Sequence, residues 1–100
     1  MNAWVYILKC ADGSFYVGSH RGPNIESRVH EHQSGFGGDY TRRRLPVKLM
    51  WCEHFQRITD TIASERQIKG WSRAKKQALI DGNWEKLSDF SRRRGGKPKA

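Results

Sequence analysis

Two tyrosines near the start of the chain lie in segments that are expected to pair as neighbouring strands. Tyr6 and Tyr16 stand on either side of the turn dipeptide Asp12-Gly13. Residues 3–10 and 15–18 are mostly β-branched, aromatic or apolar, which is typical of a β-hairpin. Because strand side chains alternate between the faces of a sheet, Tyr6 and Tyr16 are expected on one face, where their hydroxyls could converge on a ligand.

An arginine and a histidine follow at helical spacing. Asn24 can cap a helix that ends near Ser34, and Arg28 and His32 fall on the side that carries its apolar residues. Residues four positions apart stack one turn from each other, so both side chains should face whatever the helix packs against. Two interpretations stay open. The pair faces a functional site, or it is a partly buried pair satisfied by backbone carbonyls.

A glutamate breaks the pattern of the next helix, which is expected to begin at Thr59 or Asp60 and to end at Lys69. On a helical wheel Glu65 falls within the buried side, which is defined by Ile58, Ile62 and Ile68. A carboxylate there costs several kcal/mol unless it is paired, protonated or bound to a cation. Either an i, i+4 ion pair with Lys69 or a functional role would account for it.

The remaining patterns complete a small fold. Apolar residues alternate over residues 47–55, which indicates a third strand, central in the sheet or adjacent to the hairpin. Ser72 is expected to cap a helix over residues 73–81 that has Ala74 on its apolar side and Lys75 on its exposed side, and Trp84 is expected to pack back on the core. The order β-β-α-β-α-α predicts an α+β fold, with helices on the faces of the sheet.

A glycine-rich loop and a basic stretch precede the third strand. Three glycines in residues 35–38 mark a flexible loop, and the stretch that follows contains Tyr40, Arg42, Arg43 and Arg44. Such a loop suits phosphate contact. A charge run alone also fits a solvated loop whose arginines bind nothing specific, and both interpretations stay open.

The charge of the chain indicates a polyanionic partner. Its formal net charge is +9 and its pI about 10.1, as in proteins that bind nucleic acid. Residues 92–100 contain five of the basic residues and almost nothing apolar. We therefore expect one domain over residues 1–90 and a disordered basic tail over residues 91–100, which either solubilises the chain or grips phosphates.

The location of the protein is expected to be cytoplasmic. The strand pattern begins at residue 3, which leaves no room for a signal or transit peptide, and no apolar run approaches the roughly 20 residues that span a bilayer. Cys10 and Cys52 lie far apart without a Cys-x-x-Cys pair, so neither a disulfide frame nor a zinc site is indicated.

Together these residues resemble a known family. Trp4-Val5-Tyr6 and Tyr16-Val17-Gly18, followed by Arg28, His32 and Glu65, are similar to the GIY-YIG nuclease domain, closest to small stand-alone bacterial members related to the amino-terminal domain of an excinuclease. The resemblance covers nearly all of residues 3–88. It implies a three-stranded antiparallel sheet flanked by helices, and cleavage of phosphodiesters with one divalent metal.

The resemblance also implies roles for matching residues. The catalytic residues that it implies are Tyr6, Tyr16, Arg28, His32 and Glu65. Glu65 would be the single protein ligand of Mg²⁺ or Mn²⁺, whose other ligands would be waters and phosphate oxygens. Arg28 would stabilise charge on the phosphate, and one tyrosine, aided by His32, would orient or deprotonate the attacking water. Substrate binding would fall to Gly18, Tyr40, Arg42, Arg43 and Arg44.

One departure from the family pattern bears on activity. Ser19 follows Gly18 where many members place a basic residue, which would help to lower the pKa of a tyrosine; His20 or Arg21 could substitute. Many family members also carry a separate recognition domain, and none is expected here, so a structure-directed or partner-directed activity is favoured over sequence specificity.

The expected function is a metal-dependent endonuclease acting on DNA, in repair or processing, with a protein partner for targeting. The alternative from another class is a catalytically silent nucleic-acid-binding module that kept the fold. RNA as the substrate also stays open, because neither composition nor spacing separates it from DNA.

Overall fold

The computed structural model describes residues 2–88, so the predicted tail at residues 91–100 lies outside the described residues. The chain falls into two compact units, one up to Lys69 and one from Gly70 on. The first unit contains, in chain order, the elements β1 (Ala3–Lys9), β2 (Phe15–Arg21), α1 (Glu26–Gln33), α2 (Asp39–Arg42), β3 (Lys48–Phe55) and α3 (Ile58–Lys69). The second contains α4 (Arg73–Asp81).

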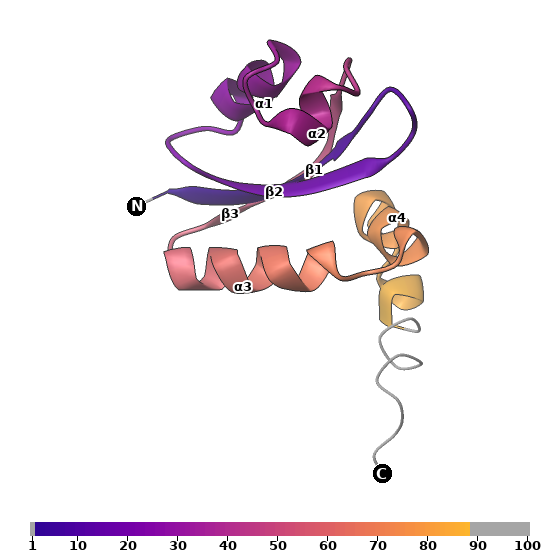
Figure 1. Ribbon diagram of the computed structural model, residues 1–100. Coiled ribbons are helices and arrows are strands. Elements are labelled where there is room, and N and C mark those ends of the chain that lie inside the picture. Colours follow the sequence, from indigo (N-terminus) through magenta and orange to yellow (C-terminus); the bar gives the residue numbers. More distant parts are fainter. Residues whose placement is uncertain (1, 89–100) are drawn as a thin grey trace. The chain divides into compact units, whose positions relative to one another are not determined.

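The first unit is a three-stranded antiparallel sheet between helices, which confirms the predicted α+β class. Its strand order is β2-β1-β3, so the third strand is adjacent to the hairpin and not central. Figure 1 shows α1 and α2 on one face of this sheet and α3 on the other. The pairing of β1 with β2 places Tyr6 opposite Gly18 and Leu8 opposite Tyr16.

The central strand β1 is apolar on both faces because both faces are covered. Tyr6 and Leu8 belong to a core cluster with Ile25, which precedes α1, and Val47, which precedes β3. The alternate set points to the opposite face, on which α3 lies, and consists of Ala3, Val5 and Ile7, all fully buried. A strand buried on both sides reads as a continuous apolar run, as residues 3–8 do.

Two helix predictions need correction. The stretch that begins at Tyr40 is not a loop throughout, since residues 39–42 form the short helix α2, and the order is therefore β-β-α-α-β-α-α. A single turn is too short for an apolar period to reveal it. Helix α3 begins at Ile58, so Thr59 and Asp60 lie in its first turn and do not precede it as caps.

The second unit confirms the bounds of its helix and corrects its faces. The Ser72 hydroxyl accepts the backbone N–H of Lys75 at the start of α4, and Gly82 ends the helix with a φ of 70°. Lys75 is buried, with its ammonium group 4.3 Å from the centre of the Trp71 ring, whereas Ala74 is exposed. Trp84 is 65 % exposed and does not pack as predicted.

No helix within residues 2–88 has both the length and the apolar character needed to cross a membrane.

Candidate functional site

A buried hydrogen-bond network joins the central strand to α1. The hydroxyl of Tyr6 lies 2.8 Å from Nε2 of His32 and accepts a hydrogen bond from Nε of Arg28 at 3.2 Å. Tyr6 comes from the middle of β1, and the other two come from α1 at the i, i+4 spacing that places them on one side of the helix. The network brings together three of the predicted site residues.

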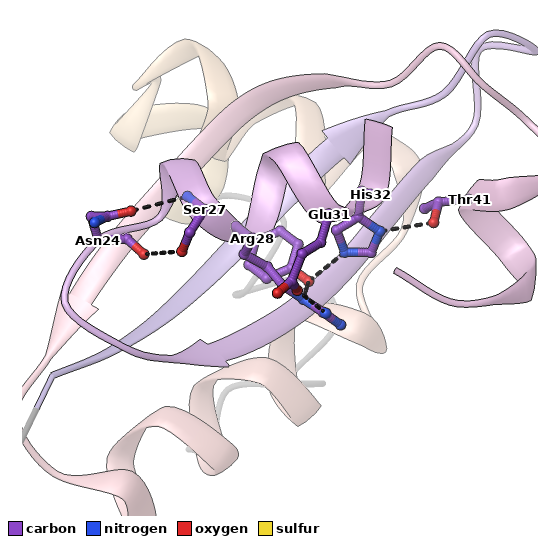
Figure 2. A network of polar contacts seen from close by, with 7 residues as sticks. Asn24, Ser27, Arg28, Glu31, His32 and Thr41 are labelled. Atoms are coloured by element: carbon purple, nitrogen blue, oxygen red, sulfur yellow. Dashed lines mark hydrogen bonds and ion pairs between the residues drawn. The ribbon is translucent and has the colours of Figure 1, made fainter. Parts of the chain in front are cut away.

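His32 is held from its other side by α2. Its Nδ1 lies 2.8 Å from the hydroxyl of Thr41, and Figure 2 shows the imidazole directed at Thr41 across the gap between the two helices. A Cβ atom built on Gly37 would overlap Nδ1 of His32, so the absence of a side chain at residue 37 lets the backbone close over the ring. His32 is consequently fully buried, and this burial lowers its pKa to about 4.

One tautomer of His32 satisfies every group of this network. Arg28 can only donate, so the oxygen of Tyr6 receives its N–H, and the phenol can donate to Nε2 of His32. In this tautomer the neutral imidazole carries its proton on Nδ1, which donates to Thr41. Burial raises the pKa of Tyr6 to about 12, which keeps the phenol protonated and able to donate.

Arg28 is the member of this network that reaches solvent. Its Nη1 lies 2.8 Å from Oε1 of Glu31, and its side chain is 25 % exposed. Burial works against the charge of Arg28, but the hydrogen bonds with Glu31 and Tyr6 outweigh it and raise the pKa of the guanidinium. The partners of Arg28 and His32 within this network are side chains, which differs from the backbone-carbonyl interpretation that the sequence left open.

Tyr16 lies between this network and Tyr40 of the basic stretch. Its ring makes an edge contact with His32, with centroids 5.3 Å apart, and stacks on Tyr40 at 5.8 Å. The guanidinium of Arg44 covers Tyr40 at 3.8 Å from its centroid and pairs with Asp12. Tyr16 is partly exposed whereas Tyr6 is fully buried, so Tyr16 is the motif tyrosine that solvent can reach.

Glu65 approaches from α3, on the opposite face of the sheet. Its Oε1 accepts a hydrogen bond from the Ser19 hydroxyl at 3.2 Å, and its Oε2 lies 3.0 Å from Nζ of Lys69. The Glu65 side chain is 20 % exposed and that of Lys69 is 58 % exposed. The i, i+4 ion pair that the sequence offered as one explanation is therefore present, next to a second contact with β2.

The two faces meet at the edge strand β2. A Cβ atom built on Gly18 would lie 2.5 Å from the hydroxyl of Tyr6, and the next residue, Ser19, binds Glu65. The phenol of Tyr6 lies against Gly18 and the carboxylate of Glu65 lies against Ser19. The Cα atoms of these two residues are about 3.8 Å apart because they are consecutive in β2. Glu65 also contributes to the raised pKa of Tyr6, as expected for a negative charge nearby.

The predicted substrate-binding arginines differ in their surroundings. Arg42 is exposed and forms an ion pair with Asp39, and Arg43 is exposed. Arg44 is only partly exposed because of its contacts with Asp12 and Tyr40. Salt bridges at such exposed positions contribute little to stability, so phosphate can compete with Asp39 for Arg42 at small cost.

Sequence reasoning missed three residues that hold the site together. Thr41 fixes His32, Glu31 fixes Arg28, and Ser19 binds Glu65. A helix from residue 26 places Glu31 three positions after Arg28, which is a signal that spacing could have given. Thr41 and Ser19 bind partners 9 and 46 residues away, and neither the helical nor the strand period relates residues at these separations.

Comparisons with known proteins agree with this architecture. Residues 2–78 match the family model described as the GIY-YIG catalytic domain. A UPF0213 protein of Natronomonas pharaonis is 44 % identical over 77 residues, which are 77 % of this chain and 88 % of that protein. A UPF0213 protein of Syntrophus aciditrophicus is 44 % identical over 85 residues, covering 84 % of this chain and 95 % of the relative.

Two solved structures have a similar fold. The solution NMR structure of a UPF0213 protein from Bacillus halodurans gives a TM-score of 0.52 at 38 % identity, covering 81 % of this chain and 84 % of the other. The solution NMR structure of a protein from E. faecalis gives a TM-score of 0.55 at 35 % identity, covering 82 % and 85 %. Both agree with a sheet of this kind flanked by helices.

Proposed function

The chain belongs to the GIY-YIG catalytic domain family, and from that membership we propose that it is a divalent-metal-dependent endonuclease that hydrolyses phosphodiester bonds in DNA. The family is one of nucleases, so the coarse activity follows from membership; the metal, the substrate and the residue roles are our proposal. One observation carries it: Arg28, bound to Tyr6, and Glu65, bound to Ser19, approach the edge strand β2 from its two faces.

The donor set at Glu65 fits a hard divalent cation. Within residues 2–88 no group of three or more His, Cys, Asp or Glu residues could hold a metal, which does not suit a caged ion such as structural zinc. Mg²⁺ instead keeps several waters and takes one or two carboxylates plus phosphate oxygens. Glu65 offers one partly exposed carboxylate, and the exposed ammonium of Lys69 can move aside from it. When bound, the cation would supply charge to the phosphate and to the attacking water.

Arg28 suits the role of phosphate ligand. Tyr6 and Glu31 each hold one of its nitrogens, which limits the positions that the guanidinium can adopt. A pre-positioned guanidinium can donate to phosphate oxygens as negative charge develops in the transition state. Tyr6 is buried and protonated, so we assign it to positioning Arg28, together with His32.

Tyr16 suits the role of orienting the attacking water. It is the motif tyrosine that solvent reaches, and its ring is fixed between His32 and Tyr40. The ring nitrogens of His32 bind the hydroxyls of Tyr6 and Thr41, and not that of Tyr16. Tyr16 would orient the water by hydrogen bonding, and the cation would promote the deprotonation of that water.

The silent binding module remains the second candidate because of the contacts of Glu65. Glu65 already has two partners in Ser19 and Lys69, which would satisfy a carboxylate that binds no metal. The two functions differ in one property: a nuclease needs Glu65 to bind a cation, whereas a binding module does not.

Cleavage of structured DNA tests the proposal. The protein would be incubated with nicked, flapped and branched DNA and with matched RNA duplexes, with Mg²⁺ or Mn²⁺ present or withheld. We expect metal-dependent cleavage of the DNA, reduced at least about 100-fold in Glu65→Ala and in Arg28→Ala. Glu53→Ala, which changes an exposed glutamate on β3, is the matched control and should retain activity. Product that persists in Glu65→Ala, or binding without cleavage by the unaltered protein, would contradict the proposal.

A further inference from the structure

The turn that ends α1 holds an aromatic residue in a fixed backbone position. Gly35 has a φ of +89° and its N–H donates to the carbonyl of His32, while the N–H of Phe36 donates to the carbonyl of Glu31 at 2.9 Å. This pair of bonds is the Schellman arrangement, in which the residue at the position of Phe36 usually packs back on the last helical turn.

Phe36 does not make the expected apolar contact. It is 82 % exposed, the most exposed of the large apolar side chains in residues 2–88. The residues of the last turn that it would cover, His30 and Glu31, are themselves polar and exposed. Single exposed apolar residues are common on protein surfaces. The position of Phe36 relative to the candidate site therefore decides whether its exposure indicates a function.

Phe36 lies at the rim of the candidate site. The next residue, Gly37, is in contact with the ring of His32, which binds the hydroxyl of Tyr6. On the other side, a Cβ built on Gly35 would lie 3.9 Å from Cγ of the exposed Arg42. Phe36 therefore lies in the chain between a residue that packs on the buried imidazole of the site and a residue beside the exposed Arg42.

The surroundings of Phe36 suit a nucleic acid strand more than a protein. The exposed arginines at residues 42 and 43 and the net charge of +9 complement a phosphate backbone. An exposed aromatic ring beside basic groups is the arrangement on which bases of single strands stack. Bases in an intact duplex have both faces covered by their neighbours, so such a ring can engage only an unpaired or end base.

We propose that Phe36 stacks on an unpaired nucleobase next to the phosphate at the candidate site, with Arg42 contacting the adjoining backbone. The inference rests on the proposed nuclease function and refines it by naming the substrate class: DNA with a single-stranded nucleotide at a flap, bulge or junction. Phe36 binds and positions this nucleotide, and it takes no part in the chemical step.

A fluorescent base tests the contact directly. The full chain would be titrated onto DNA with 2-aminopurine at the unpaired position of a flap and onto an intact duplex of the same sequence, with Ca²⁺ replacing the catalytic ion. We expect quenching of the flap base on binding. In Phe36→Ala we expect the quenching to be lost and flap affinity to fall about tenfold, with duplex affinity unchanged.

Two variants separate stacking from other effects. Phe36→Tyr keeps an aromatic face and should retain quenching, whereas Phe36→Leu keeps apolar character and should lose it. Trp84→Ala removes another exposed aromatic side chain and should bind the flap as the unaltered protein does. Quenching that persists in Phe36→Ala, or an equal loss of affinity for flap and duplex, would overturn the stacking role.

Cleavage and quenching, measured together, separate the stacking role of Phe36 from the nuclease function. Metal-dependent cleavage by a protein whose Phe36→Ala variant binds and quenches normally would refute the stacking role alone. Quenching that depends on Phe36, without cleavage under any metal, would refute the nuclease function and leave the protein as a binding module.

Discussion

Nε2 of His32 lies 2.8 Å from the hydroxyl of Tyr6, and both side chains are fully buried. This bond ties α1 to the central strand at the point where Arg28 also binds the phenol. Because the imidazole is neutral and the phenol is protonated, neither group brings an unpaired charge into the core. The uncharged pair of His32 and Tyr6 therefore holds Arg28 in position without adding a charge to the core.

The neutral state of His32 predicts how stability depends on pH. Its pKa is lowered from 6.5 to about 4, mainly by burial, so between these values the unfolded chain binds more protons than the folded protein. The free energy of unfolding should be highest above about pH 6.5 and should fall as the pH drops to about 4, by up to about 3 kcal/mol.

Urea unfolding at a series of pH values measures this loss. His32→Gln, which can still hydrogen-bond both neighbours, should show a much flatter profile between pH 6.5 and 4.5. His30→Gln, on an exposed position of the same helix, should keep the normal slope. An unchanged slope in His32→Gln would mean that other groups cause the pH dependence.

Thr41 is predicted to set the proton position of His32. Thr41→Val keeps the shape but leaves the buried Nδ1–H without an acceptor, which should cost about 1–3 kcal/mol of stability. If Tyr6 and His32 hold Arg28 in place, kcat should fall while KM changes little. Thr41→Ser restores the hydroxyl and should recover both properties. A stable, fully active Thr41→Val protein would show that the bond has no positioning role.

Residue 18 is predicted to require glycine because the Tyr6 phenol lies against it. A Cβ at this residue would lie 2.5 Å from the Tyr6 hydroxyl, so Gly18→Ala must displace the ring or the strand, at a cost of about 1–3 kcal/mol. A double-mutant cycle checks the cause, because Tyr6→Phe removes the nearest atom and should reduce the cost of Gly18→Ala. Additive effects in the cycle would argue against this contact.

The elements with strong local signals could be predicted from the sequence. Alternation in the hairpin is sufficient to place Tyr6 and Tyr16 on one face, because the side-chain period of a strand is two. Ser72 and Gly82 bound α4 as their capping chemistry indicates. The three-stranded antiparallel sheet follows from the family resemblance.

Two features of the second unit and the position of Glu65 could not be predicted. Helical periodicity does not show that Lys75 is buried with its ammonium over the ring of Trp71, or that Trp84 is exposed. The resemblance groups Glu65 with Tyr6 and His32 as catalytic residues, and the structure shows that Glu65 reaches β2 from the other face of the sheet, against Ser19. A helical wheel gives the direction of a side chain but not the face of the sheet on which its helix lies.

The most direct test of the proposed nuclease function is whether Glu65 anchors a divalent cation beside Ser19. Paramagnetic broadening of backbone amide signals on addition of Mn²⁺ locates even a weak site in a chain of 100 residues. We predict that signals of Gly18, Ser19 and Glu65 broaden first, that Glu65→Gln abolishes the effect and that Glu53→Gln preserves it. Broadening at these residues that survives in Glu65→Gln, or that occurs only elsewhere, would contradict the proposed metal site.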